Sequence, residues 1–262
     1  MKYYYPEHVR GYDRIRAEGK TAWAEIHGGV GFENFCSRPF LEAVLPKLSF
    51  QTAEPTVLDY GCGTGPDACF LAERGFRVDA VDLVPAAIEM ARQFASQRGL
   101  DIHYEVMDVC DLPPEGKKYD MIVDSYCLQC IVFDEDRGRV FSAVRARLKS
   151  QGYYLVSSAV MDAEHEALVR ENGPVLDAST GTAYSRYGNR LIDLKTGIVY
   201  SPLDEAPGDF PDAVRISGRW YLPHRRHLKP QALVEELGRA GFRVIYHDRQ
   251  HVGSLACVLR DA

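Results

Sequence analysis

Val57-Leu58-Asp59-Tyr60-Gly61-Cys62-Gly63-Thr64-Gly65-Pro66 is the stretch of this 262-residue chain that decides its fold. The residues from Thr56 to Leu58 are apolar or β-forming and indicate a short buried strand. The three glycines permit a sharp turn that a ligand can approach closely. Pro66 suits the first position of a helix, because its missing N–H would have no partner there. A strand, a glycine-rich turn and a helix N-terminus in succession are typical of a nucleotide-binding site.

The spacing of the glycines separates two kinds of nucleotide site. A dinucleotide-binding loop has glycine at its first, third and sixth positions, and the sixth position counted from Gly61 is Pro66. The loop has Gly-x-Gly-x-Gly spacing instead, and Asp59 precedes it by two residues. A carboxylate there repels a pyrophosphate but suits an ammonium or sulfonium group. An NAD-type α/β oxidoreductase is therefore the less favoured alternative.

The pattern Asp59-x-Gly61-x-Gly63-x-Gly65 resembles the first motif of the class I S-adenosylmethionine-dependent methyltransferases. The resemblance covers about residues 55–160 and 228–260, and it implies S-adenosyl-L-methionine as the cofactor. It also implies that Asp59 approaches the methionine ammonium group and that Asp124 or its backbone lies near the same end. Other candidates for cofactor contacts directly follow the strand ends: Cys62, Leu83 and Ser125.

Four aspartates close four successive predicted strands: Asp59, Asp82, Asp108 and Asp124. Ligands of open α/β sheets bind at the carboxyl ends of the strands, so we expect all four to face one crevice. Asp82, seventeen residues after Gly65, is placed to accept hydrogen bonds from both ribose hydroxyls of an adenosine. The resemblance assigns the adenine amino group to Asp108 and a ring nitrogen to the backbone N–H of Val109. Asp111 is close enough to take the role of Asp108.

Alternating strand and helix patterns predict an α/β fold with a Rossmann-like doubly wound sheet. The segment between the last two predicted strands, Arg243 to His247 and Ser254 to Leu259, is too short for a crossover helix, so these two strands must be antiparallel. The resemblance implies a mostly parallel seven-stranded sheet with a C-terminal antiparallel hairpin and the strand order 3-2-1-4-5-7-6.

The chain divides into three predicted parts. Residues 1–50 form an N-terminal helical arm, residues 51–160 and 228–262 form the cofactor-binding core, and residues 161–227 form an inserted lid. Within the lid, Leu191 to Tyr200 is predicted as a hairpin and Val214 to Tyr221 as a strand.

The aromatic residues of the arm have two interpretations, and both can hold. Most of the rings pack on the main domain, whereas Tyr5, Tyr12 and Trp23 are candidates for a substrate pocket. Gln129, after the fourth strand, is a further candidate that orients a substrate.

The densest basic cluster is Tyr221-Leu222-Pro223-His224-Arg225-Arg226-His227. It forms either a solvated turn before the last helix, which is the slightly favoured interpretation, or a site for a carboxylate or phosphate of the substrate. In the second case Tyr221, Arg225 and Arg226 contact the substrate, and either histidine serves as a base near neutral pH. Arg186, between two tyrosines, is a weaker candidate of the same kind.

The cysteines do not predict a metal site. Cys127-x-x-Cys130 lacks a second ligand pair with suitable spacing, so we interpret these residues as small buried thiols. The alternative is a pair of ligands for a soft acceptor, as in arsenic methyltransferases. Seven cysteines, an odd number, favour reduced thiols in a cytoplasmic protein.

Composition narrows the class of function. The net charge is −6 and no long basic run is present, which disfavours nucleic-acid binding, and no apolar run approaches membrane-spanning length. We therefore predict a monomeric or homodimeric enzyme that transfers a methyl group from S-adenosylmethionine to the O, N or S atom of a small molecule by in-line displacement. A non-catalytic S-adenosylmethionine-binding protein is the alternative from another class.

Overall fold

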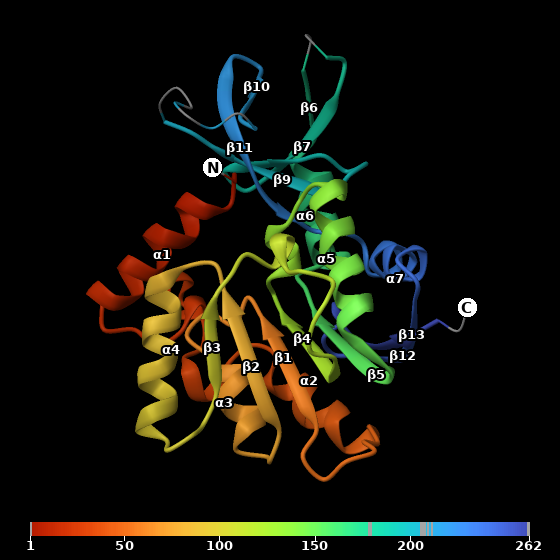
Figure 1. Ribbon diagram of the computed structural model, residues 1–262. Helices are drawn as coiled ribbons and strands as arrows, with labels where there is room; N and C mark the ends of the chain where they lie inside the picture. Colours follow the sequence, from red (N-terminus) through yellow and green to blue (C-terminus); the bar gives the residue numbers. More distant parts are fainter. Residues whose placement is uncertain (1, 178–179, 205–207, 209, 211, 261–262) are drawn as a thin grey trace.

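A computed structural model describes residues 2–177, 180–204, 208, 210 and 212–260 (Figure 1). Its main sheet has seven strands in the order β12-β13-β5-β4-β1-β2-β3. Their bounds are β1 Thr56–Tyr60, β2 Arg77–Asp82, β3 His103–Val106, β4 Tyr119–Ser125, β5 Leu148–Ser157, β12 Phe242–His247 and β13 Ser254–Leu259. Strand β13 is antiparallel to both β5 and β12, whereas β1 to β5 pair in parallel. The predicted strand order and the antiparallel C-terminal hairpin are confirmed.

Helices cover both faces of this sheet because the strands are apolar on both sides. Alternate residues of β1 point to opposite faces: Val57 packs in a cluster with helices α2, α3 and α4, and Leu58 in a cluster with α5 and α7. The helix bounds are α1 Tyr5–Ala17, α2 Arg38–Val44, α3 Pro66–Ala72, α4 Pro85–Gln97, α5 Asp134–Arg147, α6 Ala163–Asn172 and α7 Pro230–Arg239. Pro66 occupies the first turn of α3, as its position after the glycine loop predicts. Among the described residues, no helix combines the length and the apolar character that crossing a bilayer requires.

A second sheet stands over the carboxyl ends of the main strands (Figure 1). Its six antiparallel strands have the order β10-β11-β9-β8-β7-β6. Their bounds are β6 Pro174–Leu176, β7 Ala183–Tyr187, β8 Arg190–Ile192, β9 Ile198–Pro202, β10 Val214–Ile216 and β11 Arg219–Arg226. The pairing of β8 with β9 confirms the hairpin predicted over Leu191 to Tyr200.

Two expectations for this region are wrong. The segment predicted as one strand, Val214 to Tyr221, contains a hairpin, because Ser217 and Gly218 both adopt positive φ angles of 49° and 86° and turn the chain. The basic cluster is not a solvated turn, since most of it belongs to β11, which pairs with β9.

Five short 3₁₀ helices are present among the described residues. They are η1 Trp23–His27, η2 Phe32–Asn34, η3 Leu45–Lys47, η4 Val109–Asp111 and η5 Leu128–Cys130. Three of them, η1, η4 and η5, contribute residues to the cavity described next.

Candidate active site

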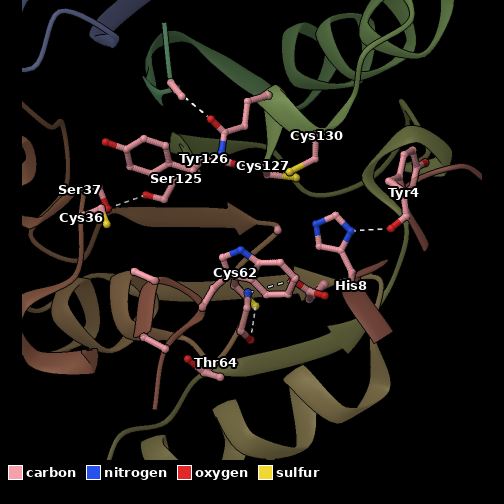
Figure 2. A pocket seen from close by; sticks show the side chains of 18 of the residues that line it. Tyr4, His8, Cys36, Ser37, Cys62, Thr64, Ser125, Tyr126, Cys127 and Cys130 are labelled. Carbon is pink, nitrogen blue, oxygen red and sulfur yellow. Dashed lines mark hydrogen bonds between the residues drawn. The ribbon is translucent and has the colours of Figure 1, made fainter. Parts of the chain in front are cut away.

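A cavity of about 400 Å³ lies at the carboxyl ends of β1 to β4. Its floor comes from the residues that follow these strands, and its cover comes from α1, η1 and the second sheet (Figure 2). The volume is in the range of sites for small molecules and cofactors. The predicted residues on its wall are Tyr12, Trp23, Gly61, Cys62, Gly63, Asp82, Leu83, Asp108, Val109, Ser125, Gln129, His224, Arg225 and His227.

The glycine loop approaches its neighbours too closely for side chains. A Cβ on Gly61 would lie 2.4 Å from Sγ of Cys127, and one on Gly63 would lie 2.7 Å from the hydroxyl of Tyr12. Both glycines also have positive φ angles, 65° and 57°. Gly65 does not line the cavity, and a Cβ there would lie 2.5 Å from the hydroxyl of Tyr104. Gly65 is therefore required for the close packing of the loop against Tyr104.

Asp82 ties the glycine loop to the end of β2. Its carboxylate accepts hydrogen bonds from the backbone N–H groups of Gly63 and Val84, each at 2.9 Å. The side chain lies on the cavity wall although the residue is only 7% exposed, and burial raises its pKa to about 6. Each carboxylate oxygen has a second acceptor direction, so Asp82 can bind a ligand as well as the loop.

Asp108 and not Asp111 takes the position at the end of β3. Its carboxylate accepts hydrogen bonds from the Tyr4 hydroxyl at 2.7 Å and from the Cys110 N–H at 2.9 Å, and Val109 lies beside it on the wall. Asp111 is exposed and lies 3.5 Å from the amine of Lys2.

The other two strand-end acids lie behind the cavity wall, so the expectation that all four face one crevice is wrong for Asp59 and Asp124. The carboxylate of Asp124 accepts hydrogen bonds from the backbone N–H groups of Cys127 and Leu128 and thereby caps η5, and burial raises its pKa to about 7. Asp59 is fully buried and neither of its carboxylate oxygens has a hydrogen-bond partner among the described residues. Burial is the largest cause that raises the pKa of Asp59 well above its usual range, and the negative charge of Asp67 is the next largest.

Asp67 is a cavity residue that the sequence patterns missed. It lies in the first turn of α3 and accepts hydrogen bonds at 2.5 Å from the hydroxyls of Ser37 and Ser125. These contacts join the N-terminal arm, the glycine loop and the end of β4 at one point. An acid in the first turn of the helix after the glycine loop was the available signal, because helix N-termini favour carboxylates.

Helix α1 and its N-cap residue present a stripe of side chains at positions i, i+4 and i+8 to the cavity: Tyr4, His8 and Tyr12. Trp23 packs against this helix where Gly11 leaves room, since a Cβ on Gly11 would lie 2.2 Å from the indole ring. Tyr5 points elsewhere and does not line the cavity. Tyr4 and His8 were missed although their spacing to Tyr12 is visible in the sequence.

The basic cluster is divided by a β-bulge between Pro223 and Arg225. A bulge changes the direction of successive side chains, and His224 and Arg225 both reach the cavity. Arg226 instead bonds the carboxylate of Asp134 and the carbonyl of Val132, away from the cavity.

Two further substrate candidates lie elsewhere in the second sheet. Tyr221 packs in the apolar core of this sheet with Tyr184 and Leu191. Arg186 is exposed on β7, and Arg190, at the start of β8, lines the cavity.

Glu7 connects α1 to β11 across the top of the cavity. Its carboxylate accepts hydrogen bonds from both terminal nitrogens of Arg225, at 2.9 and 3.1 Å, and lies 2.7 Å from Nε2 of His224. Burial alone would raise the pKa of Glu7, but the bond from His224 and the charge of Arg225 outweigh it and lower the pKa below its usual range. The guanidinium of Arg225 is buried, so this pair is its main source of charge compensation.

Replacing Glu7 by alanine should destabilise the fold by about 2 kcal/mol, because a buried guanidinium would lose its carboxylate, and the partial exposure of Glu7 reduces the penalty. Urea unfolding of the Glu7→Ala and Asp13→Ala variants at pH 7 measures this; Asp13 is exposed on the same helix and its variant should match the parent. Because the folded-state pKa of Glu7 is lowered, its contribution is present above about pH 4 and is lost as the pH falls further. Equal stabilities of the two variants at pH 7 would contradict the assignment.

Four cysteines lie on the cavity wall: Cys36, Cys62, Cys127 and Cys130. All seven cysteines of the chain are free. Burial raises the pKa of Cys127 and of Cys130, so both are neutral thiols at pH 7. Within the described ranges, no group of three or more His, Cys, Asp or Glu side chains is arranged to hold a metal ion. The side-chain oxygen of Gln129 accepts a hydrogen bond from the N–H of Ala159 at 2.9 Å, which fixes its orientation at the wall.

Known proteins share parts of this chain. Residues 57–152 match the family model described as "Methyltransferase domain". The 2-heptyl-1-hydroxyquinolin-4(1H)-one methyltransferase of Mycobacteroides abscessus is 32% identical over 101 residues, which are 38% of this chain and 44% of that protein. The ubiquinone biosynthesis O-methyltransferase of Rickettsia conorii is 31% identical over 118 residues, 45% of this chain and 39% of that protein. The matches thus span less than half the length of these two relatives.

A solved structure extends the likeness to almost the whole chain. An S-adenosylmethionine-dependent methyltransferase from Clostridium acetobutylicum superposes with a TM-score of 0.58 at 17% identity, over 90% of this chain and 95% of the other. At 17% identity the superposition shows only that the fold is shared, whereas the family model identifies a methyltransferase domain in residues 57–152. Together with the confirmed strand order and the glycine loop, they show that residues 57–152 match a methyltransferase domain and that the chain has the Rossmann-like fold of the S-adenosylmethionine-dependent methyltransferases.

Proposed function

We propose that this protein binds S-adenosylmethionine in the 400 Å³ cavity and transfers its methyl group to a small-molecule acceptor held in the same cavity. The observation that carries this proposal is the continuity of the cavity. One wall has the glycine loop with Asp82 and Asp108, and the opposite wall has side chains of α1 and β11 that a cofactor site alone does not need.

The residues at the strand ends fit a cation that carries a nucleoside. Asp82 would accept the ribose hydroxyls, Asp108 and Val109 would contact the adenine, and Gly61 to Gly63 would follow the methionine chain. The methionine end would lie near Ser125 and Asp67, in front of the unpartnered carboxylate of Asp59. Burial raises the pKa of Asp59 and of Asp67, and the ammonium and sulfonium charges of the ligand would lower these pKa values and stabilise the ionised carboxylates. When bound, this cofactor supplies an electrophilic methyl group.

The chain itself would position the acceptor and exclude water. Helix α1 and Trp23 close one side of the cavity, and Glu7 holds α1 to β11 on the other. We propose that residues 161–227 act as the lid and that residues 1–50 act as a covering arm. Exclusion of water and alignment of the acceptor oxygen, nitrogen or sulfur with the methyl group are the main requirements of an in-line displacement.

The names of the relatives favour a small organic acceptor. One is a methyltransferase of a hydroxyquinolinone and another is an O-methyltransferase of ubiquinone biosynthesis. The seven free cysteines support a location in the reducing cytoplasm.

Calorimetric titration with S-adenosylmethionine, followed by transfer of a tritiated methyl group to 2-heptyl-1-hydroxyquinolin-4(1H)-one and to a set of small phenols, amines and thiols, tests the proposal. We expect binding in the micromolar range and product with at least one acceptor class. Absence of cofactor binding would refute the proposal. Binding without transfer to any acceptor would favour a non-catalytic S-adenosylmethionine-binding protein.

A further inference from the structure

His8 has a geometry that no other histidine of the cavity shares. Its Nδ1 atom lies 2.6 Å from the carbonyl oxygen of Tyr4, four residues earlier at the N-cap of α1. A carbonyl can only accept a hydrogen bond, so Nδ1 carries the proton and Nε2 keeps a free lone pair. No hydrogen bond to Nε2 is present among the described residues.

The ring of His8 is held in place and faces the cavity. It stacks on the indole of Trp23 with a centroid distance of 5.1 Å and an interplanar angle of 28°. Figure 2 shows the ring pointing into the cavity, on the side lined by Cys127 and Cys130. The ring orientation and the tautomer are therefore both fixed before any acceptor arrives.

The surroundings of His8 keep it neutral. Burial lowers its pKa to about 4, and the positive charge of Arg225 and the neighbouring His224 act in the same direction. The Glu7 carboxylate and the Tyr4 carbonyl act in the opposite direction and are outweighed. At pH 7 the group facing the acceptor is thus an uncharged imidazole with an available lone pair.

The two histidines predicted from the sequence are less suited to this role. His224 lines the cavity, but its Nε2 lies against Glu7 and its Nδ1 is buried without a hydrogen-bond partner among the described residues. The ring of His227 packs against the rings of Tyr187 and His165, and its Nδ1 atom lies 3.5 Å from the Tyr187 hydroxyl.

We propose that His8 is a catalytic residue of the methyl transfer proposed above, and that the acceptor is a hydroxyl group on a planar ring, of the phenol or enol type. The hydroxyl donates its hydrogen bond to Nε2 of His8. As the acceptor oxygen bonds the methyl carbon, the carbon–sulfur bond breaks with its electron pair on sulfur, and the hydroxyl proton passes to Nε2. The imidazolium then releases this proton to water.

The chemistry of the wall favours a hydroxyl over an amine. A neutral amine attacks with a lone pair that it already has, whereas a hydroxyl gains nucleophilicity as its proton is withdrawn, which is what a fixed imidazole lone pair provides. The cavity has aromatic side chains that suit a flat ring: Tyr4, Tyr12, Trp23 and Tyr126.

The tautomer of His8 gives a test that does not depend on turnover. In protein labelled with ¹⁵N-histidine, long-range ¹H–¹⁵N spectra distinguish the tautomers, and the His8 signals are those missing from the His8→Gln variant. We expect a neutral ring protonated on Nδ1 at pH 7, and a shift of the Nε2 signal when 2-heptyl-1-hydroxyquinolin-4(1H)-one is added with S-adenosylhomocysteine. A ring protonated on Nε2, or charged at pH 7, would overturn the proposal. If His8→Gln does not fold, His8→Asn provides the same assignment.

Kinetics separate a catalytic role from a structural one. His8→Gln should lower kcat with the same hydroxyl probe about 10²-fold, with unchanged S-adenosylmethionine affinity by calorimetry. His103→Gln is the control, because His103 is exposed on β3 away from the cavity. An unchanged kcat, or a matching loss of cofactor affinity, would refute the role of His8. Failure of the parent protein to bind S-adenosylmethionine would instead refute the proposed function.

Discussion

Replacing Asp82 by alanine should weaken S-adenosylmethionine binding by about 10²- to 10⁴-fold while the protein stays folded. In the proposed complex the carboxylate accepts hydrogen bonds from two ribose hydroxyls, and bonds to a charged acceptor contribute about 1.5–3 kcal/mol each. The same carboxylate holds the N–H groups of Gly63 and Val84, so its loss also loosens the glycine loop. Calorimetric titration of parent and variant measures the change, and circular dichroism checks the fold.

Asp79→Ala is the matched control for this substitution. Asp79 lies on the same strand, β2, but bonds Lys117 and Tyr119 at the far side from the cavity, so its variant should bind the cofactor like the parent. An Asp82→Ala protein with parental affinity would disprove the cofactor assignment.

The raised pKa of Asp82, about 6, adds a dependence on pH that can be tested separately. The ionised carboxylate is the better acceptor for ribose hydroxyls, so affinity should be full above pH 7 and should fall as the pH drops through about 6. Asp82→Asn cannot titrate, and its weaker affinity should lose this dependence between pH 5 and 8. A parent whose affinity is flat over this range would contradict the role of the carboxylate.

The part of the site that the sequence predicts well is the part built from local patterns. The glycine loop, Asp82 and Asp108 each directly follow a short apolar strand, and in a parallel sheet the carboxyl ends of neighbouring strands meet at one edge. The strand order followed from the family resemblance. For Asp59 the same reasoning wrongly predicted a side chain that faces the cavity. Its side chain points toward α3 beneath the wall, because successive residues of a strand alternate between the two faces.

The opposite wall depends on contacts between distant residues. The pair of Glu7 and Arg225 joins positions 218 residues apart, and nothing near either residue indicates the other. The bulge that turns His224 and Arg225 to the cavity contains no glycine that would indicate it in the sequence. Arg190, and not the predicted Arg186, lines the cavity, and the pairing of β7 with β8 that places these residues is not visible in the sequence. His8 is different, since its helical spacing to Tyr4 and Tyr12 was present in the sequence and was overlooked.

Arg137 should be the most sensitive position for stability. Its guanidinium is only 2% exposed, pairs with both carboxylate oxygens of Glu236 on α7, and donates to the carbonyls of Leu128 and Ile131 around η5. Arg137→Met would leave the Glu236 carboxylate and the Ile131 carbonyl without their donor in a buried place, which costs about 3–5 kcal/mol; the Leu128 carbonyl keeps the N–H of Ile131. Urea unfolding measures this loss.

Arg139→Met is the matched control, because Arg139 lies on the same helix, is exposed, and pairs only with Glu135 and Asp136 one turn away. Its effect should be within about 0.5 kcal/mol of zero.

Adding Glu236→Leu to Arg137→Met should restore part of the stability, since the unpaired carboxylate is then removed as well. If Arg137→Met were no more destabilising than Arg139→Met, the buried pair would not be what fixes η5. Because η5 and the residue before it supply Cys127, Gln129 and Cys130 to the cavity wall, a true loss at Arg137 should also weaken acceptor binding at urea concentrations below the unfolding transition.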